Sequence, residues 1–268
     1  MALQRLSRVV QDSPKLKAWD YAYKYRAVDQ NYRFEKVAPH HMPELMDLSV
    51  GFFDDEPLNQ ATGSTLENCR KGIEYLFAYS IAAQNVCMLN EICYDKRTNK
   101  AIGFRLGNPY YRDPKKAPFT SPKVDMTDQI RSVFAPLDEV FLPFWDIFPD
   151  EDMVVRGEMI YIDRPYRTDT GLCRVWMDYD LNLPALAQKT GANIYSTLCT
   201  ARQTKGWYAK QGYKMSYRGP THITNAKGEQ VPLPQGSIEL YTTDMHTTAT
   251  IDVKPCWEKM KLIGLIPK

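Results

Sequence analysis

Apolar and polar residues alternate along this chain with two periodicities, one typical of helices and one typical of strands. Leu45, Leu48 and Phe52 recur at helical spacing and predict an amphipathic helix. Ser64, with Glu67 three residues later, forms a capping-box signature and predicts the start of a second helix. Helices are expected over residues 43–53, 64–84, 127–147 (bent or split by Pro136 and Pro143) and 201–211.

Short apolar runs between these helices predict strands. Strands are expected over residues 32–37, 86–94, 101–110, 153–163, 194–200, 214–218 and 237–243. Residues 95–100 join two of them as a hairpin, and the proline-rich residues 111–122 predict a loop or lid. A polar loop at residues 163–170 leads from a strand into a further helix and then another strand. This βαβ order predicts an α/β fold in which part of the sheet is parallel and buried.

Composition narrows the function classes. With 268 residues, 44% of them hydrophobic, the chain can bury a full core as one large or two small domains. A net charge of +2 without a run of Lys and Arg argues against a nucleic-acid-binding protein. No segment reaches the roughly 18 uninterrupted apolar residues of a membrane span, so no membrane partner is expected.

Cysteine and histidine usage indicates a cytoplasmic protein without a metal. The six cysteines form no C-x-x-C pair and lie mostly in apolar surroundings, which is typical of reduced thiols. The four histidines have no metal-ligand spacing. The first 17 residues faintly resemble a mitochondrial presequence, but Asp12 and Pro14 interrupt the pattern, and a surface helix or arm is the expected alternative.

Residues 52–59, Phe-Phe-Asp-Asp-Glu-Pro-Leu-Asn, contain the clearest candidate for chemistry. Pro57 biases Glu56 away from helical geometry at the end of an apolar helix, and Asp54 and Asp55 precede it. Burial and like-charge neighbours both favour the neutral carboxyl, so Glu56 is a candidate base with a raised pKa. The alternative for these residues is an acidic turn on the surface.

Three separated blocks carry a resemblance to a known family. The strand–loop–helix–strand order followed by Tyr208-Ala209-Lys210-Gln211-Gly212-Tyr213 resembles the GNAT superfamily of N-acetyltransferases. Residues 52–59, 145–152 and 194–199 resemble signature blocks of the invertebrate arylalkylamine N-acetyltransferases, including the dopamine type. The resemblance spans about residues 32–217.

It implies a mixed, mostly antiparallel central sheet with a parallel βαβ portion, flanked by helices. It also implies an acetyltransferase domain over residues 31–245, with an N-terminal extension at 1–30 and a C-terminal tail at 246–268.

The resemblance implies acetyl-CoA as co-substrate and no metal. In the family a glycine-rich loop holds the pyrophosphate at a helix N-terminus. Here Thr170 and Leu172 replace small residues of that loop, and Asp169 adds a negative charge. An ordinary surface loop in a protein that does not bind CoA is the alternative. The residues implied in CoA binding are Met159, Ile160, Tyr161, Ile162, Arg167, Thr168, Thr170, Gly171, Leu172 and Arg174.

The resemblance also implies catalytic roles. Glu56 would deprotonate the amine, Thr200 and Thr204 would relay the proton, and Tyr208 would protonate the CoA thiolate. Thr200 is alternatively an N-cap of the next helix, and Tyr208 a packing residue. Direct attack of the amine needs no acyl-enzyme, so Cys199 is not assigned as a nucleophile.

Dense aromatic residues predict the substrate class. Phe52, Phe53, Trp145 and Phe148 flank two signature blocks and are expected to hold an aromatic ring. The expected function is acetylation of small aromatic monoamines such as serotonin, tryptamine, dopamine, octopamine and tyramine, by a monomer. Two alternatives stay open: a non-catalytic CoA- or amine-binding module, and an acyltransferase whose polyamine or protein amino acceptor is attracted by Asp54 and Asp55.

Overall fold

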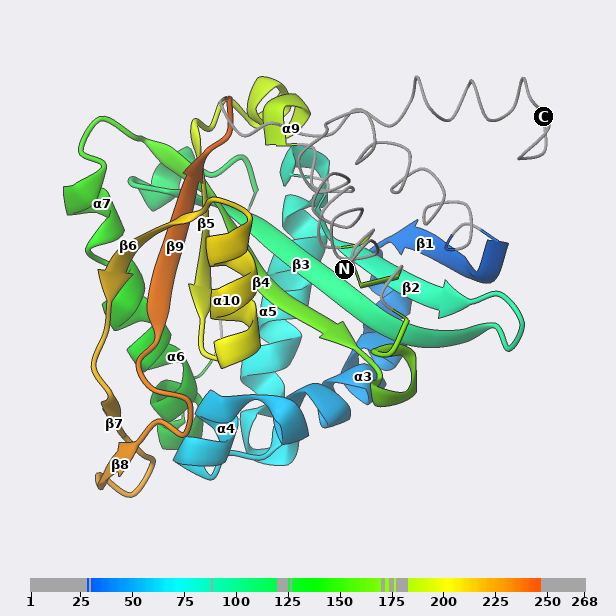
Figure 1. The fold of residues 1–268 in the computed structure, drawn as a ribbon, viewed down its shortest axis with the longest axis horizontal. Helices are drawn as coiled ribbons and strands as arrows, with labels where there is room; N and C mark the ends of the chain where they lie inside the picture. Colours follow the sequence, from blue (N-terminus) through cyan, green and yellow to red (C-terminus); the bar gives the residue numbers. More distant parts are fainter. Residues whose placement is uncertain are drawn as a thin grey trace, which may run out of the picture.

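A mixed seven-stranded sheet forms the centre of the molecule in the order β1-β2-β3-β4-β5-β9-β6 (Figure 1). Its strands are β1 (Tyr32–Lys36), β2 (Glu91–Asp95), β3 (Lys100–Tyr111), β4 (Met153–Ile162), β5 (Ile194–Cys199), β6 (Lys214–Arg218) and β9 (Glu239–Asp244). Neighbouring strands run antiparallel except β4 and β5, which are parallel. The predicted α/β class, a mostly antiparallel sheet with a parallel portion, is confirmed.

The computed structural model describes residues 28, 30–87, 89–119, 125, 127–169, 172, 173, 176 and 183–246. The expected N-terminal extension and C-terminal tail therefore lie almost wholly outside the described residues, and the division into domains stays a prediction. None of the described helices is long and apolar enough to cross a membrane.

Helices cover both faces of the sheet (Figure 1). On one face lie α3 (Met42–Asp55), α5 (Leu66–Cys87) and α6 (Asp128–Phe141), and on the other lie α9 (Leu183–Thr190) and α10 (Arg202–Lys210). Short elements connect them: η1 (Pro39–His41), α4 (Pro57–Thr62), η2 (Pro114–Lys116), α7 (Phe144–Ile147) and η3 (Arg164–Tyr166). A small hairpin of β7 (His222–Thr224) and β8 (Gln230–Pro232), which the sequence did not predict, precedes β9.

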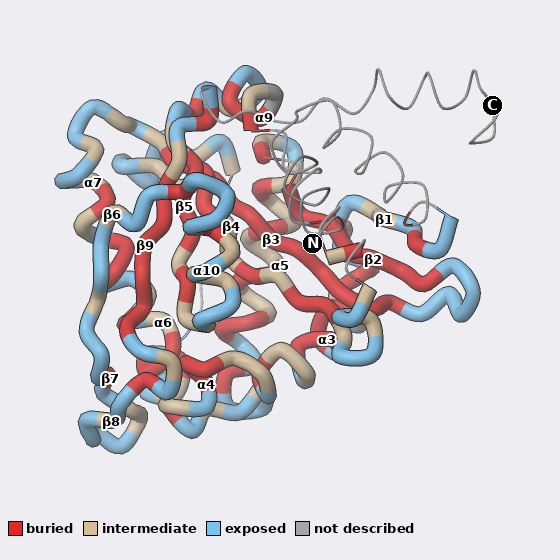
Figure 2. The backbone as a smooth tube through the Cα atoms, in the orientation of Figure 1, coloured by how far each residue is buried: buried red, intermediate tan, exposed pale blue. Residues whose placement is uncertain are grey.

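The main core fills the space between the sheet and the α3, α5 and α6 layer. Leu45 and Phe77 from the helices pack there with Phe104 and Val154 from the sheet, all essentially without solvent exposure. Figure 2 shows continuous buried stretches along β3 and β9, whereas the edge strand β6 is largely exposed. The burial of these apolar faces explains why the amphipathic helical pattern was readable in the sequence.

Two local predictions are wrong. Residues 86 and 87 end α5 instead of starting a strand, and β2 begins only at Glu91. Thr65, not Ser64, caps α5, since its hydroxyl accepts the Asn68 amide at 3.3 Å. The helix expected over residues 127–147 is split, as predicted: it forms α6 and α7, which are separated at Pro143, whereas Pro136 is tolerated inside α6.

Candidate active site

The parallel strands β4 and β5 separate after only three paired residues. Val155 to Gly157 pair with Tyr195 to Thr197, and the Thr197 hydroxyl donates to the Gly157 carbonyl at 3.3 Å. Beyond this point a cavity of about 250 Å³ opens between the strands. The α3–α4 junction and α10 complete its wall, so both faces of the sheet contribute residues.

An irregularity in β4 shapes the same cavity. Leu106 of β3 pairs with Met159 whereas Gly107 pairs with Gly157, so Glu158 has no partner in the β3–β4 register. Such a bulge bends a strand and redirects its side chains. Glu158 thereby lines the cavity, as do the carboxylates of Asp55 and Glu56.

Glu56 lies at the junction of α3 and α4, where the chain leaves helical geometry (φ −78°, ψ 118°). Its amide donates to the Phe52 carbonyl at 3.0 Å, and Pro57 begins α4 directly after it. Its carboxylate accepts the Leu58 amide at 3.3 Å, and the Thr200 hydroxyl lies close enough to favour its charged form. Burial raises the pKa of Glu56 above its usual value, and the Thr200 hydroxyl and the Leu58 amide only partly oppose this rise. The residue is therefore placed in a cavity wall and not on an acidic surface turn.

Thr200 and Thr204 both line the cavity but have different partners. Thr200 is not an N-cap, because α10 begins at Arg202 and the Arg202 amide donates instead to Oε1 of Gln235 at 2.7 Å. Thr204 donates its proton to the Ala201 carbonyl at 2.8 Å, within its own helix. Of the two, Thr200 is the hydroxyl that lowers the pKa of Glu56 in part.

Tyr208 enters the cavity from α10, on the face of the sheet opposite α3. Its ring packs against Tyr213 and Tyr241, with centroids 4.9 and 6.3 Å away. Burial, followed by the nearby Cys199, raises the pKa of the Tyr208 phenol, while the neighbouring Thr197 and Tyr195 hydroxyls lower it in part.

The four residues expected to line the CoA arm, Met159 to Ile162, all line the cavity. Tyr161 packs against α3, since a Cβ at Gly51 would lie 1.9 Å from its hydroxyl. The backbone of β4 past Gly157 is no longer paired with β5 and is therefore available for hydrogen bonds to an extended ligand.

Arg167 reaches the cavity but is already bound to Asp55. Its Nε donates to the Ile162 carbonyl at 2.6 Å, and its Nη2 pairs with one Asp55 oxygen. Arg164 pairs with the other Asp55 oxygen, its Nε at 3.1 Å. Burial alone would raise the pKa of Asp55, but the hydrogen bonds from Arg164 and Arg167 bring the pKa below its usual value. Asp55 thus ties the end of α3 to the loop after β4.

Two described residues of the expected phosphate loop, Asp169 and Leu172, contact the rest of the protein and do not line the cavity. Asp169 accepts the Leu172 amide at 3.0 Å and the Tyr32 hydroxyl at 2.9 Å. Leu172 is fully buried in a cluster with Trp176, which leaves its side chain no route to a ligand. Thr168 is exposed and does not line the cavity. Thr170, Gly171 and Arg174 lie outside the described residues.

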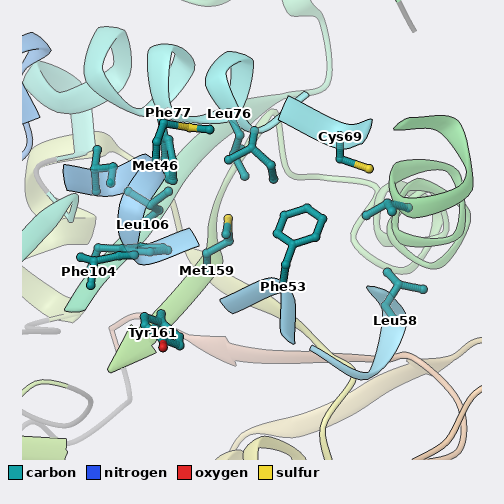
Figure 3. Close-up of a cluster of buried hydrophobic side chains, with 14 of the residues drawn as sticks. Met46, Phe53, Leu58, Cys69, Leu76, Phe77, Phe104, Leu106, Met159 and Tyr161 are labelled. Atoms are coloured by element: carbon teal, nitrogen blue, oxygen red, sulfur yellow. The ribbon is translucent and has the colours of Figure 1, made fainter. Parts of the chain in front are cut away.

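Of the four residues expected to hold an aromatic ring, only Phe52 lines the cavity. Figure 3 shows Phe53 in the buried cluster with Met46, Leu76 and Phe77, and it is 5% exposed.

Trp145 and Phe148 lie at α7 and pack against the main core. Arg112 holds that segment: Nη2 donates to the carbonyls of Trp145, Phe148 and Pro149 at 2.9–3.1 Å, and Nε donates to the Glu151 carbonyl at 2.9 Å.

Several contributors to the cavity, Glu158 among them, were missed in the sequence. Glu158 is paired with Arg156, whose Nε and Nη2 approach its two oxygens at 2.8 and 3.0 Å. The Arg156 guanidinium also lies 4.0 Å above the Tyr110 ring. An Arg-x-Glu spacing in a buried strand places both side chains on one face, and this spacing in the sequence could have indicated the Arg156–Glu158 pair. No comparable pattern in the sequence indicated that Tyr195 lines the cavity or that Asp55 pairs with Arg164 and Arg167.

A group of possible metal ligands lies elsewhere, at the end of β1. Side-chain atoms of Glu35, His40 and His41 lie within 4.8 Å of one another. Nδ1 of His41 accepts the Ala38 amide at 3.0 Å, so its Nε2 carries the proton shared with Glu35 at 3.2 Å. Both ring nitrogens of His41 are therefore already in use.

Comparisons with known proteins agree with this architecture. No family model matches the chain. Among solved structures, arylalkylamine N-acetyltransferase 2 from Aedes aegypti is 18% identical and superposes with a TM-score of 0.56, over 80% of this chain and 99% of that one. The C-terminal condensation domain of Ebony, in complex with β-alanyl-dopamine, gives 16% and 0.60, over 80% and 98%. The polyamine N-acetyltransferase of Drosophila melanogaster, which forms N-acetylagmatine, gives 16% and 0.53, over 80% and 100%. Likeness at this identity establishes the fold, and this chain has the fold of the GNAT acetyltransferases, as the sequence resemblance predicted.

Proposed function

We propose that this protein is an acetyl-CoA-dependent N-acetyltransferase that acetylates aromatic monoamines such as tryptamine, serotonin, dopamine, octopamine or tyramine. The observation that carries the proposal is the pairing of Glu56 with Thr200 in the cavity at the β4–β5 separation, with Tyr208 in the wall from the other face. A base and an acid on opposite sides of one cavity suit an acyl transfer in which one proton leaves the amine and another reaches the thiolate.

The reaction follows from these positions. An arylalkylamine is protonated at neutral pH, so Glu56, helped by the Thr200 hydroxyl, takes a proton before nitrogen attacks the thioester carbonyl. The raised pKa of Glu56 strengthens it as a base at neutral pH. Tyr208 then supplies a proton to the departing sulfur. Acetyl-CoA would supply the activated acetyl group along the unpaired part of β4, with Arg167 at the outer end.

Charge in the cavity favours a monoamine over a polyamine. Three carboxylates line it: Asp55, Glu56 and Glu158. Arginines pair with Asp55 and with Glu158, which leaves Glu56 as the carboxylate without a cationic partner among the described contacts of the cavity. A second ammonium group of a polyamine would meet neutralised pairs, whereas the ring of a monoamine would meet Phe52.

A second candidate is a non-catalytic module that binds an amine without CoA. Two contacts favour it: Asp55 neutralises Arg167, and Asp169 accepts the Leu172 amide that a phosphate would otherwise use. In that case the cavity would bind amines but transfer no acetyl group.

Calorimetric titration with acetyl-CoA, followed by a turnover assay with each of the five monoamines, agmatine and spermidine, tests both candidates. The proposal expects acetyl-CoA binding and faster acetylation of at least one aromatic monoamine than of either polyamine. Binding of an amine without any acetyl-CoA binding at millimolar concentration would support the second candidate. Preferred acetylation of agmatine or spermidine would refute the monoamine assignment while retaining the acyltransferase.

A further inference from the structure

Helix α10 begins with a sequence that is unfavourable for the start of a helix. Its N-cap position is Ala201, whose side chain offers no acceptor to the free amides of the first turn. Arg202 and Lys205 add two positive charges to that turn, where the helix dipole disfavours them. The same turn directly follows Thr200 and contributes to the cavity wall. Its position therefore depends on contacts with another part of the chain.

Three hydrogen bonds join this turn to residues 235–237, which lie between β8 and β9 (Figure 1). Oε1 of Gln235 accepts the Arg202 amide at 2.7 Å, from 33 positions away in the chain. Nζ of Lys205 donates to the carbonyl of Gln235 at 3.1 Å and to that of Ser237. Gln235 thus supplies the acceptor that the N-cap residue lacks, and the two carbonyls offset the Lys205 charge at the positive end of the helix.

A tight turn holds Gln235 in this place. The Gly236 amide donates to the Leu233 carbonyl at 3.2 Å, and Gly236 has a φ of +85°, which glycine adopts without strain. Leu233 is buried in the main core, and its amide donates to the Thr221 carbonyl at 2.9 Å. The turn is therefore anchored in the core on one face of the sheet, while its Gln235 side chain caps a helix on the other face.

We propose that Gln235 is a positioning residue: it caps α10 from a distant part of the chain and thereby holds Thr200 beside the Glu56 carboxylate. Thr200 comes just before the capped turn, and both Thr200 and Glu56 line the cavity. Gln235 does not line it, so its effect on the reaction passes through the start of α10. The inference rests on the proposed function, because the placement of Thr200 beside Glu56 affects turnover only in an acetyltransferase that uses both.

Two substitutions at Gln235 separate the cap from the size of the side chain. Gln235→Met keeps a similar length but has no oxygen to accept the Arg202 amide, whereas Gln235→Glu keeps an acceptor whose charge is favoured at a helix N-terminus. We expect kcat to fall roughly threefold to tenfold in Gln235→Met, within the range of a lost N-cap, and to return to the wild-type value in Gln235→Glu. KM for acetyl-CoA should stay nearly unchanged, because its arm would lie along β4.

Gln230→Met is the matched control. The Gln230 side chain donates to the Thr224 hydroxyl at 2.6 Å within the β7–β8 hairpin, and Gln230 does not line the cavity. This variant should keep wild-type kcat.

Amide hydrogen exchange tests the cap itself. The Arg202 amide should exchange faster in Gln235→Met than in the wild type or in Gln235→Glu, while the amides of β3 keep their protection and so report intact folding. A double-mutant cycle then tests the route to the cavity. If Gln235 acts through Thr200, Gln235→Met has no further effect on kcat in a Thr200→Val background.

Four outcomes in an active enzyme would overturn the proposal and leave the proposed function standing. They are unchanged exchange at Arg202, wild-type kcat in Gln235→Met, a Gln235→Glu enzyme as slow as Gln235→Met, and additive losses in the double mutant. Wild-type protein that acetylates no amine would instead remove the proposed function, and the positioning role of Gln235 with it.

Discussion

Replacing Glu56 by Gln is expected to abolish most activity while making the protein more stable at neutral pH. The amide oxygen of glutamine can still accept the Leu58 amide and the Thr200 hydroxyl, so the start of α4 and the shape of the cavity should persist. What disappears is the proton acceptor. Removal of a general base typically costs 10²–10⁴ in rate, which is about 2.7–5.4 kcal/mol of barrier at about 1.36 kcal/mol for each tenfold.

The stability gain follows from the sign of the pKa shift. The pKa of Glu56 is raised in the folded protein, so its contribution to stability is fully present when the carboxyl is neutral and is lost as pH rises through the raised pKa. Glutamine is neutral at every pH. The melting temperatures of the two proteins should therefore coincide at a pH below the ordinary glutamate pKa of about 4.3, and the variant should melt higher at pH 8.

Initial rates with one amine across pH 6 to 10 measure the first effect, and melting curves below about pH 4.3 and at pH 8 measure the second. The rate loss should shrink as pH approaches the pKa of the amine, because free amine no longer needs a base. Acetyl-CoA binding should be unchanged, which serves as the control for folding. Wild-type turnover at pH 7, or a variant that melts below wild type at pH 8, would refute the reasoning.

Four further predictions concern other contacts of the described residues. Arg167→Ala should weaken acetyl-CoA binding roughly 10–100-fold by calorimetry, more at low salt, since charge-assisted contacts contribute about 1.5–3 kcal/mol each; unchanged affinity would remove Arg167 from the site. Asp55→Asn should tighten the same binding a few-fold, because Arg167 loses a competing carboxylate, and a weaker complex would show that the pair orders the loop instead. Thr200→Val should lower kcat and move the acidic limb of the pH–kcat profile to higher pH, because the Thr200 hydroxyl lowers the pKa of Glu56. Thr204→Val should cost less activity, because the Thr204 hydroxyl donates to the Ala201 carbonyl within its own helix. A larger loss in Thr204→Val than in Thr200→Val would instead assign the proton relay to Thr204. Arg112→Ala should lower the free energy of unfolding by about 1–3 kcal/mol in urea with kcat nearly unchanged, and a large kinetic defect at full stability would contradict its structural role.

Most helices and strands were predictable because their apolar faces repeat at a fixed spacing. The errors lie where local signals compete. Residues 86 and 87 are apolar and were expected to start a strand, but they continue the preceding helix α5. Ser64 and Thr65 are both good caps, and only the hydrogen bond to Asn68 decides between them.

The site was predictable in part. Glu56, Thr200 and Tyr208 meet in one cavity, as a resemblance between separated blocks implied, although their roles stay predictions. The sequence could not show that Trp145 and Phe148 pack in the core and do not bind a substrate ring, because an aromatic side chain fills a core as readily as a pocket. The pairing of Asp55 with Arg167 joins residues 112 positions apart, and no local pattern reports such a contact.

The three-residue pairing of β4 with β5 has a consequence for how the molecule opens. Strands β1 to β4 form one continuous antiparallel block, and β5, β9 and β6 form another, so the hydrogen-bond ladder is shortest where the ligand cavity begins. Such a junction divides the sheet into two cooperative units whose amides exchange with solvent at different rates. A ligand bound between β4 and β5 would contact both units. Slower amide hydrogen exchange in β4 and in β5 would then show, residue by residue, where the ligand binds.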